Sequence, residues 1–319
     1  MMRVAAIDLG TNTTRLLVAD VVDGCVEPVV RREAITRLGE SVDRRHILLP
    51  TSVARVRNVL VDYRREAEFL GAERVLAVGT SAVRDAENGE AFLGEVEWSY
   101  GFATRLLDGA EEAALTLRGV ASGRKLEPGT LVVDIGGGST ELVLTGDDGA
   151  TSAISTEAGS VRLTERFLRS DPPSDAELDA CSAHVRSLLP ELDASRAIGV
   201  AGTVSTAAAI ELANRSATSG VRLKSNSDGY RLSRVSIDST TRRLARIPVA
   251  DRERVPGLEP ARAPVIVAGL VILREILDRY RLAELEVSEH DLLDGAALAA
   301  AELPAPNEGR VPPSAFTCC

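Results

Sequence analysis

The sequence predicts an α/β fold of two domains, and two observations lead to this prediction. Short apolar segments that suit strands alternate along most of the chain with longer segments whose apolar residues recur at helical spacing. Residues 5–18 and residues 131–144 also align with each other without a gap, about one domain length apart. At 319 residues, the chain is long enough for two domains of ordinary size.

The two aligned segments predict equivalent β-hairpins. The first reads AAIDLGTNTTRLLV and the second reads LVVDIGGGSTELVL, so that Asp8 aligns with Asp134 and Gly10 with Gly136. Each segment consists of an apolar strand, a tight polar turn and a second apolar strand. Two domains with equivalent hairpins predict a pseudo-symmetric pair whose turns face each other across a cleft.

The remaining segments predict the other helices and strands in turn. After the first hairpin we expect a helix with Thr51 as its N-cap, a strand in RVLAVGTS, a helix ended by Gly101, and a helix that begins after the N-cap candidate Asp108. After the second hairpin we expect helices in SVRLTERFL and DAELDACSAHVRSLLPEL, a strand in AIGVAG, a helix from Thr203 and a long helix in APVIVAGLVILREILDRY. The proline-rich residues 304–319 predict a disordered tail.

The glycine-rich turns of the two hairpins predict phosphate binding. Glycines between strands allow successive backbone N–H groups to point toward an anion. Asp8 and Asp134, each at the end of a strand, are placed to hold a hydrated Mg²⁺ or to orient water. One such turn alone could be an ordinary hairpin capped by an aspartate, but two copies make that alternative weaker. A third segment, GVAGTVSTAAAI, runs from a strand into a helix start at Gly202 and Thr203, which also suits phosphate.

Composition and charge exclude several classes of protein. The formal net charge of −10 argues against a general nucleic-acid binder, which needs a broad basic surface. No apolar run reaches the roughly 18 residues needed to span a membrane, and the N-terminus leads directly into a strand without the pattern of a signal peptide. The four cysteines and three histidines lack the spacing of a metal site. We therefore expect a cytoplasmic protein.

Eight segments resemble, in order along nearly the whole chain, the exopolyphosphatase and guanosine pentaphosphate phosphohydrolase (Ppx/GppA) family of the actin, hexokinase and Hsp70 superfamily. They are AIDLGTNTTRLLVAD, VGTSAVRDAENGEAFL, LDGAEEAALTLRGV, VVDIGGGSTELVL, GSVRLTERFL, GVAGTVSTAAAIEL, GLEPARAPVIVAGLVILREIL and VSEHDLLDGAAL. TSAVRDA together with DIGGGSTE is specific to this family. The resemblance implies the short form with two actin-like (ribonuclease H-like) domains, the first from residues 1–120 and about 298–310 and the second from 121–297.

The resemblance also implies roles for particular residues. Glu112 is the general base, and Arg84 neutralises charge on the transferred phosphoryl group. Catalysis further involves Glu141, and Mg²⁺ or the attacking water is held by Asp134, Glu141 and Asp8. The phosphates of the substrate are bound by the hairpin turns and the third segment: Gly10, Thr11, Asn12, Thr13, Arg15, Gly136, Gly137, Gly138, Ser139, Thr140, Gly202 and Thr203. Arg162 is a further candidate. Glu111 and Glu112 could instead both be ordinary acids at a helix start, and we expect that role for Glu111. A structural role is likewise expected for His290 and Asp291.

The reaction implied by the resemblance is Mg²⁺-dependent hydrolysis of the terminal phosphate of inorganic polyphosphate by an activated water, with Mn²⁺ or a monovalent cation such as K⁺ as further candidates. The nearest alternative removes the 5′ phosphate of guanosine pentaphosphate (pppGpp) in the stringent response, with (p)ppGpp as substrate or inhibitor. An alternative of another class is a weakly catalytic sensor of polyphosphate or alarmone. A homodimer is also implied.

Three departures from the family pattern concern substrate preference. Asp108 stands where a serine is more usual, Pro264 stands where an acid is common, and residues 225–228 lack a frequent histidine. The last two lie in the second domain and leave the choice between polyphosphate and pppGpp open.

Overall fold

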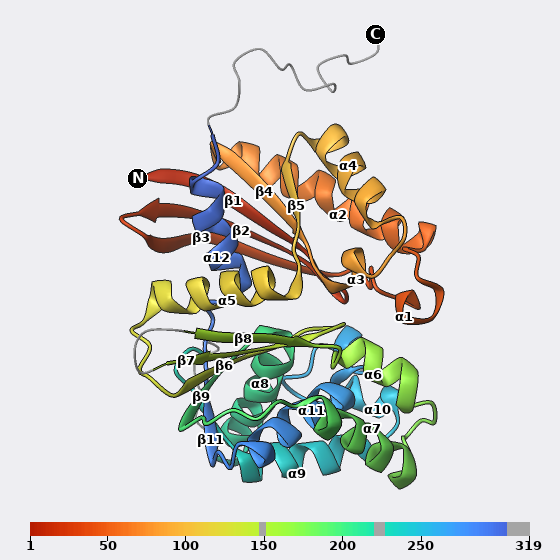
Figure 1. Cartoon of the computed structure of the whole chain (residues 1–319). Coiled ribbons are helices and arrows are strands. Elements are labelled where there is room, and N and C mark those ends of the chain that lie inside the picture. Colours follow the sequence, from red (N-terminus) through yellow and green to blue (C-terminus); the bar gives the residue numbers. More distant parts are fainter. Residues whose placement is uncertain (147–150, 220–226, 305–319) are drawn as a thin grey trace. The chain divides into compact units, whose positions relative to one another are not determined.

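The computed structural model describes residues 1–146, 151–219 and 227–304 of the chain (Figure 1). The chain divides into two compact units, one formed by Met1–Lys125 with His290–Cys319 and the other by Leu126–Glu289. The return to unit 1 therefore begins at His290 rather than near residue 298, because the helix that follows packs against the sheet and a helix of unit 1. The disordered tail predicted for 304–319 lies, beyond Pro304, outside the described residues.

Unit 1 contains a five-stranded sheet and helices on both of its faces. Its elements are β1 (Met2–Leu9), β2 (Thr13–Val22), β3 (Cys25–Ile35), α1 (Val42–Arg45), α2 (Pro50–Phe69), β4 (Arg74–Gly79), α3 (Ser81–Arg84), α4 (Gly89–Tyr100), β5 (Ala103–Leu106), α5 (Gly109–Gly123) and α12 (Leu292–Ala301). The strand order is β3-β2-β1-β4-β5, in which β1, β2 and β3 are antiparallel neighbours and β1, β4 and β5 run parallel.

Alternate residues of β1 enter two separate cores in unit 1. Ala5, Ile7 and Leu9 pack with α2 and α4 on one face of the sheet, whereas Val4 and Ala6 pack with α12 and α5 on the other face (Figure 1). This alternation follows from the two-residue period of a strand. Asp8 shares the second face and is placed beside α12.

Unit 2 contains a six-stranded sheet. Its elements are β6 (Thr130–Ile135), β7 (Thr140–Thr145), β8 (Thr151–Thr156), α6 (Ser160–Phe167), α7 (Asp175–Leu188), β9 (Arg196–Val200), α8 (Ala201–Ser219), β10 (Arg231–Ser233), α9 (Arg234–Ala245), α10 (Val249–Arg252), a 3₁₀ turn (Pro260–Arg262), α11 (Ile266–Arg279) and β11 (Glu284–Val287). The strand order is β10-β11-β9-β6-β7-β8. One large core joins the sheet to α11, which is buried along most of its length.

The two sheets share one topology, which confirms the predicted fold class. In unit 2, β6, β7 and β8 form the antiparallel part and β9 and β11 the parallel part, in the same order as β1, β2, β3, β4 and β5 of unit 1. The exception is β10, which adds an antiparallel edge strand beside β11. The internal sequence repeat therefore corresponds to two α/β domains with equivalent sheets.

Several predicted helix boundaries are confirmed, and two are wrong. Asp108 caps α5 through the backbone N–H of Glu111, and Gly101 ends α4 in the left-handed conformation that glycine favours. Thr51 is not an N-cap, because α2 begins at Pro50, whose fixed φ suits the first helical position. The helix expected from Thr203 already begins at Ala201. In the described parts of the chain, no helix is long and apolar enough to cross a membrane.

Candidate active site

Both hairpin turns are closed by the same hydrogen bond. The N–H of Gly10 donates to the carbonyl of Thr13 at 3.0 Å, and the N–H of Gly136 donates to the carbonyl of Ser139 at 3.0 Å. A Cβ at Gly10 would lie 2.8 Å from the Thr13 oxygen, and one at Gly136 would lie 3.2 Å from the Ser139 oxygen. Glycine is needed at the start of each turn because the two strands approach so closely there.

The carbonyl groups of the second turn are bound by the start of α6. The N–H of Ser160 donates to Gly136 at 3.0 Å, and the N–H of Val161 donates to Gly137 at 2.8 Å. The Arg162 side chain, which is buried, donates from Nε to the carbonyl of Gly138 at 2.8 Å. The carbonyl oxygens of this turn are thus directed toward α6.

The first turn is held in an equivalent way by the segment after β3. The N–H groups of Thr36 and Arg37 donate to the carbonyl of Asn12 at 3.1 and 2.9 Å, and the N–H of Gly39 donates to that of Thr11 at 2.8 Å. Across the part of the chain that the structure describes, no hydrogen bond uses the backbone N–H of Thr11, Asn12, Gly137 or Gly138. Each unit therefore presents consecutive amide donors in a fixed turn, which is the arrangement that binds an anion such as phosphate.

Asp8 and Asp134, which precede the two turns, each belong to a row of directly paired residues that runs across the sheet. In unit 1 the row is Val78, Asp8, Arg15 and Glu33, on β4, β1, β2 and β3. In unit 2 it is Val200, Asp134, Glu141 and Ser155, on β9, β6, β7 and β8. The two rows match position by position, so Arg15 stands where Glu141 does. The unit 1 row is balanced by a cation, whereas the unit 2 row places two carboxylates opposite each other.

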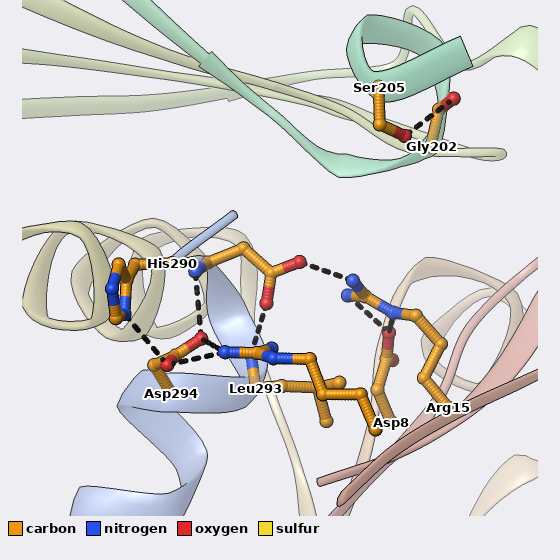
Figure 2. Close-up of polar contacts among 9 residues, drawn as sticks. Asp8, Arg15, Gly202, Ser205, His290, Leu293 and Asp294 are labelled. Carbon is orange, nitrogen blue, oxygen red and sulfur yellow. Dashed lines mark hydrogen bonds and ion pairs between the residues drawn. The ribbon is translucent and has the colours of Figure 1, made fainter. Parts of the chain in front are cut away.

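Asp8 and Arg15 form a buried ion pair in unit 1. Nε and Nη2 of Arg15 donate to Oδ2 of Asp8 at 3.0 and 2.8 Å (Figure 2). Burial raises the pKa of Asp8, and the neighbouring Arg15 charge opposes this increase. Oδ1 of Asp8 is buried and accepts no hydrogen bond from any described residue. This oxygen can therefore accept a hydrogen bond from a water molecule or act as a metal ligand.

Asp134 and Glu141 bring two carboxylates together in unit 2. Their side chains share one face of the sheet because directly opposed residues of antiparallel strands do so. Both residues are buried, at 6% and 1% exposure. The hydroxyl of Ser155 donates to Oε1 of Glu141 at 2.8 Å. Opposed like charges destabilise a sheet, so this pair is suited to a cation or to a water that donates to both groups.

The residues predicted to bind Mg²⁺ are carboxylates, and carboxylate oxygens are ligands that this ion prefers. Within the described residues, no group of three or more His, Cys, Asp or Glu side chains is arranged to hold a metal. Mg²⁺ usually keeps several waters and is held by one or two carboxylates together with substrate phosphates. Asp8 with its unpaired Oδ1 and the Asp134–Glu141 pair are donors of that kind. Within each unit, the carboxylates present therefore fit Mg²⁺.

The side chains of Arg84 and Glu112 are in contact in unit 1. Nη1 of Arg84 lies 3.1 Å from Oε2 of Glu112 and also donates to the carbonyl of Leu107 at 2.8 Å. A second carboxylate, that of Asp85, lies 4.0 Å from Nε of Arg84, which makes it the weaker contact. Glu112 is only 7% exposed, in the first turns of α5.

Glu111, the neighbour of Glu112, has the structural role expected of it. Its carboxylate accepts from the N–H of Asp108 at 2.9 Å, and the N–H of Glu111 donates to Asp108 at 2.8 Å. The Asp108 backbone and the Arg105 guanidinium hold the pKa of Glu111 below its usual value. The two adjacent glutamates therefore differ clearly: one completes a capping box, and the other is buried beside an arginine.

The third predicted loop is tightly packed within unit 2. Ala201 has a φ of 65°, an uncommon value for a residue with a side chain. The Arg262 guanidinium lies directly against Gly202, and Thr203 packs against Gly269 of α11. Ser205 donates to the carbonyl of Gly202 at 3.3 Å (Figure 2). A backbone held in a strained conformation often marks a functional turn.

The remaining predicted residues differ in their surroundings. Ser139 is buried at the second turn, while Thr13 is partly exposed at the start of β2. Thr140 is completely buried, and its hydroxyl donates to the carbonyl of Ala158, which directs it into the unit. Sequence reasoning did not identify Ser155, and it gave Asp291 a structural role only. Asp291 is marked in the sequence by its place in the segment VSEHDLLDGAAL, but its contact with Arg15 is not, and no sequence signal marks Ser155, because these contacts are made with other strands or helices.

Comparison with known proteins shows the family of the chain. A model of the Ppx/GppA phosphatase family matches residues 17–302. Exopolyphosphatase 2 of Mycobacterium tuberculosis is 38% identical to the chain, and the alignment covers 94% of this chain and 99% of that protein. Among solved structures, an exopolyphosphatase-like protein is 32% identical with a TM-score of 0.85, covering 95% of this chain and 100% of that one. A Ppx/GppA family member from Aquifex aeolicus is 30% identical with a TM-score of 0.75, covering 94% and 98%.

Proposed function

The chain belongs to the Ppx/GppA phosphatase family, and we propose on this basis that it is an exopolyphosphatase that removes the terminal phosphate of inorganic polyphosphate. The similarity to named exopolyphosphatases indicates an enzyme that hydrolyses phosphoanhydride bonds. The observation that carries the proposal within the structure is the contact of the buried Glu112 with Arg84 in a unit that also presents an anion-binding turn.

Glu112 acts as the general base in the proposed reaction. A water that attacks phosphorus must lose a proton, and a shielded carboxylate at a fixed position can accept it. Arg84, which holds Glu112 at 3.1 Å, also provides positive charge for the phosphoryl group as it leaves the chain. The leaving group is the shortened polyphosphate, and the products are orthophosphate and a chain with one phosphate fewer.

Each of the two glycine-rich turns binds phosphate oxygens of the substrate. Consecutive amide donors of Thr11 and Asn12, and of Gly137 and Gly138, bind the phosphate oxygens. Asp8, Asp134 and Glu141 are the residues that would hold Mg²⁺ through its waters. When bound, Mg²⁺ neutralises phosphate charge.

Replacement of Glu112 tests the proposed function. The Glu112→Gln variant keeps the size of the side chain and one acceptor oxygen but cannot accept a proton at neutral pH. We expect its kcat for phosphate release from polyphosphate, measured with Mg²⁺, to fall at least about 100-fold. Glu111→Gln is the matched control, because it changes the adjacent glutamate of the same helix turn and should retain activity. Full activity of Glu112→Gln would show that another group is the base.

The choice of substrate is tested in the same assay. Polyphosphates of several lengths and pppGpp are compared by kcat/KM, since both substrate classes end in the phosphate that the turns are proposed to bind. A higher value for pppGpp would favour the alternative phosphohydrolase. Tight binding of both without phosphate release from the wild type would favour the sensor. The proposed homodimer is tested by sedimentation equilibrium.

A further inference from the structure

Arg15 joins two carboxylates that are far apart in the sequence. Its Nε and Nη2 donate to Oδ2 of Asp8 at 3.0 and 2.8 Å (Figure 2). Its Nη1 donates to Oδ2 of Asp291. All three side chains are largely buried, with exposures of 14%, 6% and 9% for Arg15, Asp8 and Asp291. A buried arginine between two carboxylates is fixed in position, and its charge is already balanced.

Asp291 is itself held firmly at the start of α12. Its Oδ1 accepts from the N–H of Leu293 at 2.8 Å, and its backbone N–H donates to Asp294 in a capping box. The backbone of Asp291 lies so close to Gly119 of α5 that no Cβ could fit there. Asp291 therefore contacts α5, the helix that carries Glu112, while its carboxylate reaches Arg15.

The equivalent row in unit 2 shows what this contact adds. Arg15 and Glu141 occupy matching positions, and Glu141 accepts its hydrogen bond from Ser155 on the neighbouring strand. Arg15 instead joins Asp8 of the first turn to a helix on the face of the unit 1 sheet. The arginine is thus placed to orient Asp8.

We propose that Asp291 and Arg15 are positioning residues, which together hold the Asp8 carboxylate so that its Oδ1 faces the reacting phosphate or its bound water. The inference rests on the proposed function, since it concerns the geometry of that reaction. Neither residue contacts the reacting atoms. Their loss should lower kcat with little effect on KM, because a small displacement of a catalytic group slows chemistry more than it weakens binding.

The variant Asp291→Asn separates the charge from the helix cap. Asparagine caps helices as well as aspartate does, so α12 should keep its start, while the ion pair with Arg15 is lost. We expect kcat to fall about ten-fold and KM to change less than about two-fold. Arg15→Gln should give the same pattern. Asp20→Asn is the matched control: Asp20 pairs with Arg3 at 2.9 and 2.8 Å on the same two strands, away from the turn, so kcat should not change.

Two results would overturn this inference. The first is an increase in KM at unchanged kcat in Arg15→Gln, which would mean that Arg15 contacts the substrate. The second is wild-type kinetics in Asp291→Asn. The assay uses whichever of polyphosphate and pppGpp the wild type hydrolyses, and a wild type inactive on both contradicts the proposed function alone. In that event a crystal structure of Asp291→Asn decides the inference: a displaced Asp8 carboxylate supports it, and an unmoved one overturns it.

Discussion

The carboxylate of Glu141 accepts a hydrogen bond from a hydroxyl on the neighbouring strand. Ser155 on β8 donates to Oε1 of Glu141 at 2.8 Å, and Glu141 is 1% exposed opposite Asp134. Removal of the hydroxyl in Ser155→Ala leaves this oxygen buried without that donor. We expect a loss of about 1–3 kcal/mol in the free energy of unfolding and a fall of about ten-fold in kcat. Urea unfolding and phosphate-release assays measure the two effects.

Ser152→Ala is the control for Ser155→Ala. Ser152 is exposed on the same strand, so its loss should change neither stability nor activity appreciably. A Ser155→Ala enzyme with wild-type kcat would contradict a catalytic role for the oriented Glu141 carboxylate.

At the scale of residues, the sequence predicts the residues within a motif better than the distant residues that contact that motif in the folded protein. Asp108 is predicted as the N-cap of α5, and the structure confirms it and adds that Glu111 completes a capping box with Asp108. The contact of Arg15 with Asp291 spans 276 residues, and such a pair cannot be deduced from local spacing. Ser155 is paired through strand register, which one sequence does not reveal.

The start of α5 is the element on which the candidate base depends. Asp108 caps the helix, and the N–H of Glu112 donates to the Asp108 carbonyl at 2.9 Å. Asp108→Ala removes the cap and should lower the free energy of unfolding by about 1 kcal/mol. Asp108→Ser should restore most of it, because serine is an equally good cap. Urea unfolding followed by circular dichroism checks both values.

A capping box in unit 2 provides the control for this element. Ser174 caps α7 through the N–H of Glu177, so Ser174→Ala should cause a similar loss of stability. That change should leave kcat unaltered, whereas Asp108→Ala should also lower kcat because it loosens the turn that carries Glu112. Equal kcat values for the two alanine variants would argue against this link between cap and base.

At the scale of elements, the sequence predicts those that repeat or carry clear end signals. The hairpins follow from the internal alignment, and α4 and α5 follow from Gly101 and Asp108. The strand β10 is only three residues long and forms as an edge beside β11, so tertiary pairing rather than local pattern determines it. The start of α8 was misplaced because Ala201 adopts a left-handed φ that its type does not favour.

The unfolding of unit 2 can be measured by chemical labelling of one buried thiol in its core. Cys181 on α7 is completely buried, and burial raises its pKa to about 12. In a variant with Cys25, Cys318 and Cys319 changed to serine, we expect no reaction with a thiol reagent at mildly alkaline pH. The neutral, shielded thiol is neither nucleophilic nor accessible. Addition of urea should expose it, so the extent of labelling should follow the unfolding of unit 2.

A variant that keeps Cys25 and changes the other three cysteines to serine is the control. Cys25 is exposed at the start of β3 and should react readily in the folded protein. Rapid labelling of Cys181 without urea would contradict the close packing of the core that contains it.

Unit 1 is built from two separate parts of the chain, and this affects the order in which the two units can fold during synthesis on the ribosome. One of its two cores needs α12, whose buried residues include Leu292, Leu293, Ala296 and Ala297. Unit 2 is continuous from Leu126 to Glu289 and is therefore translated completely before α12 is made. Domains usually complete folding in the order of synthesis. Here the unit that is begun first must be finished last, and its apolar sheet face has to be shielded until the final helix emerges.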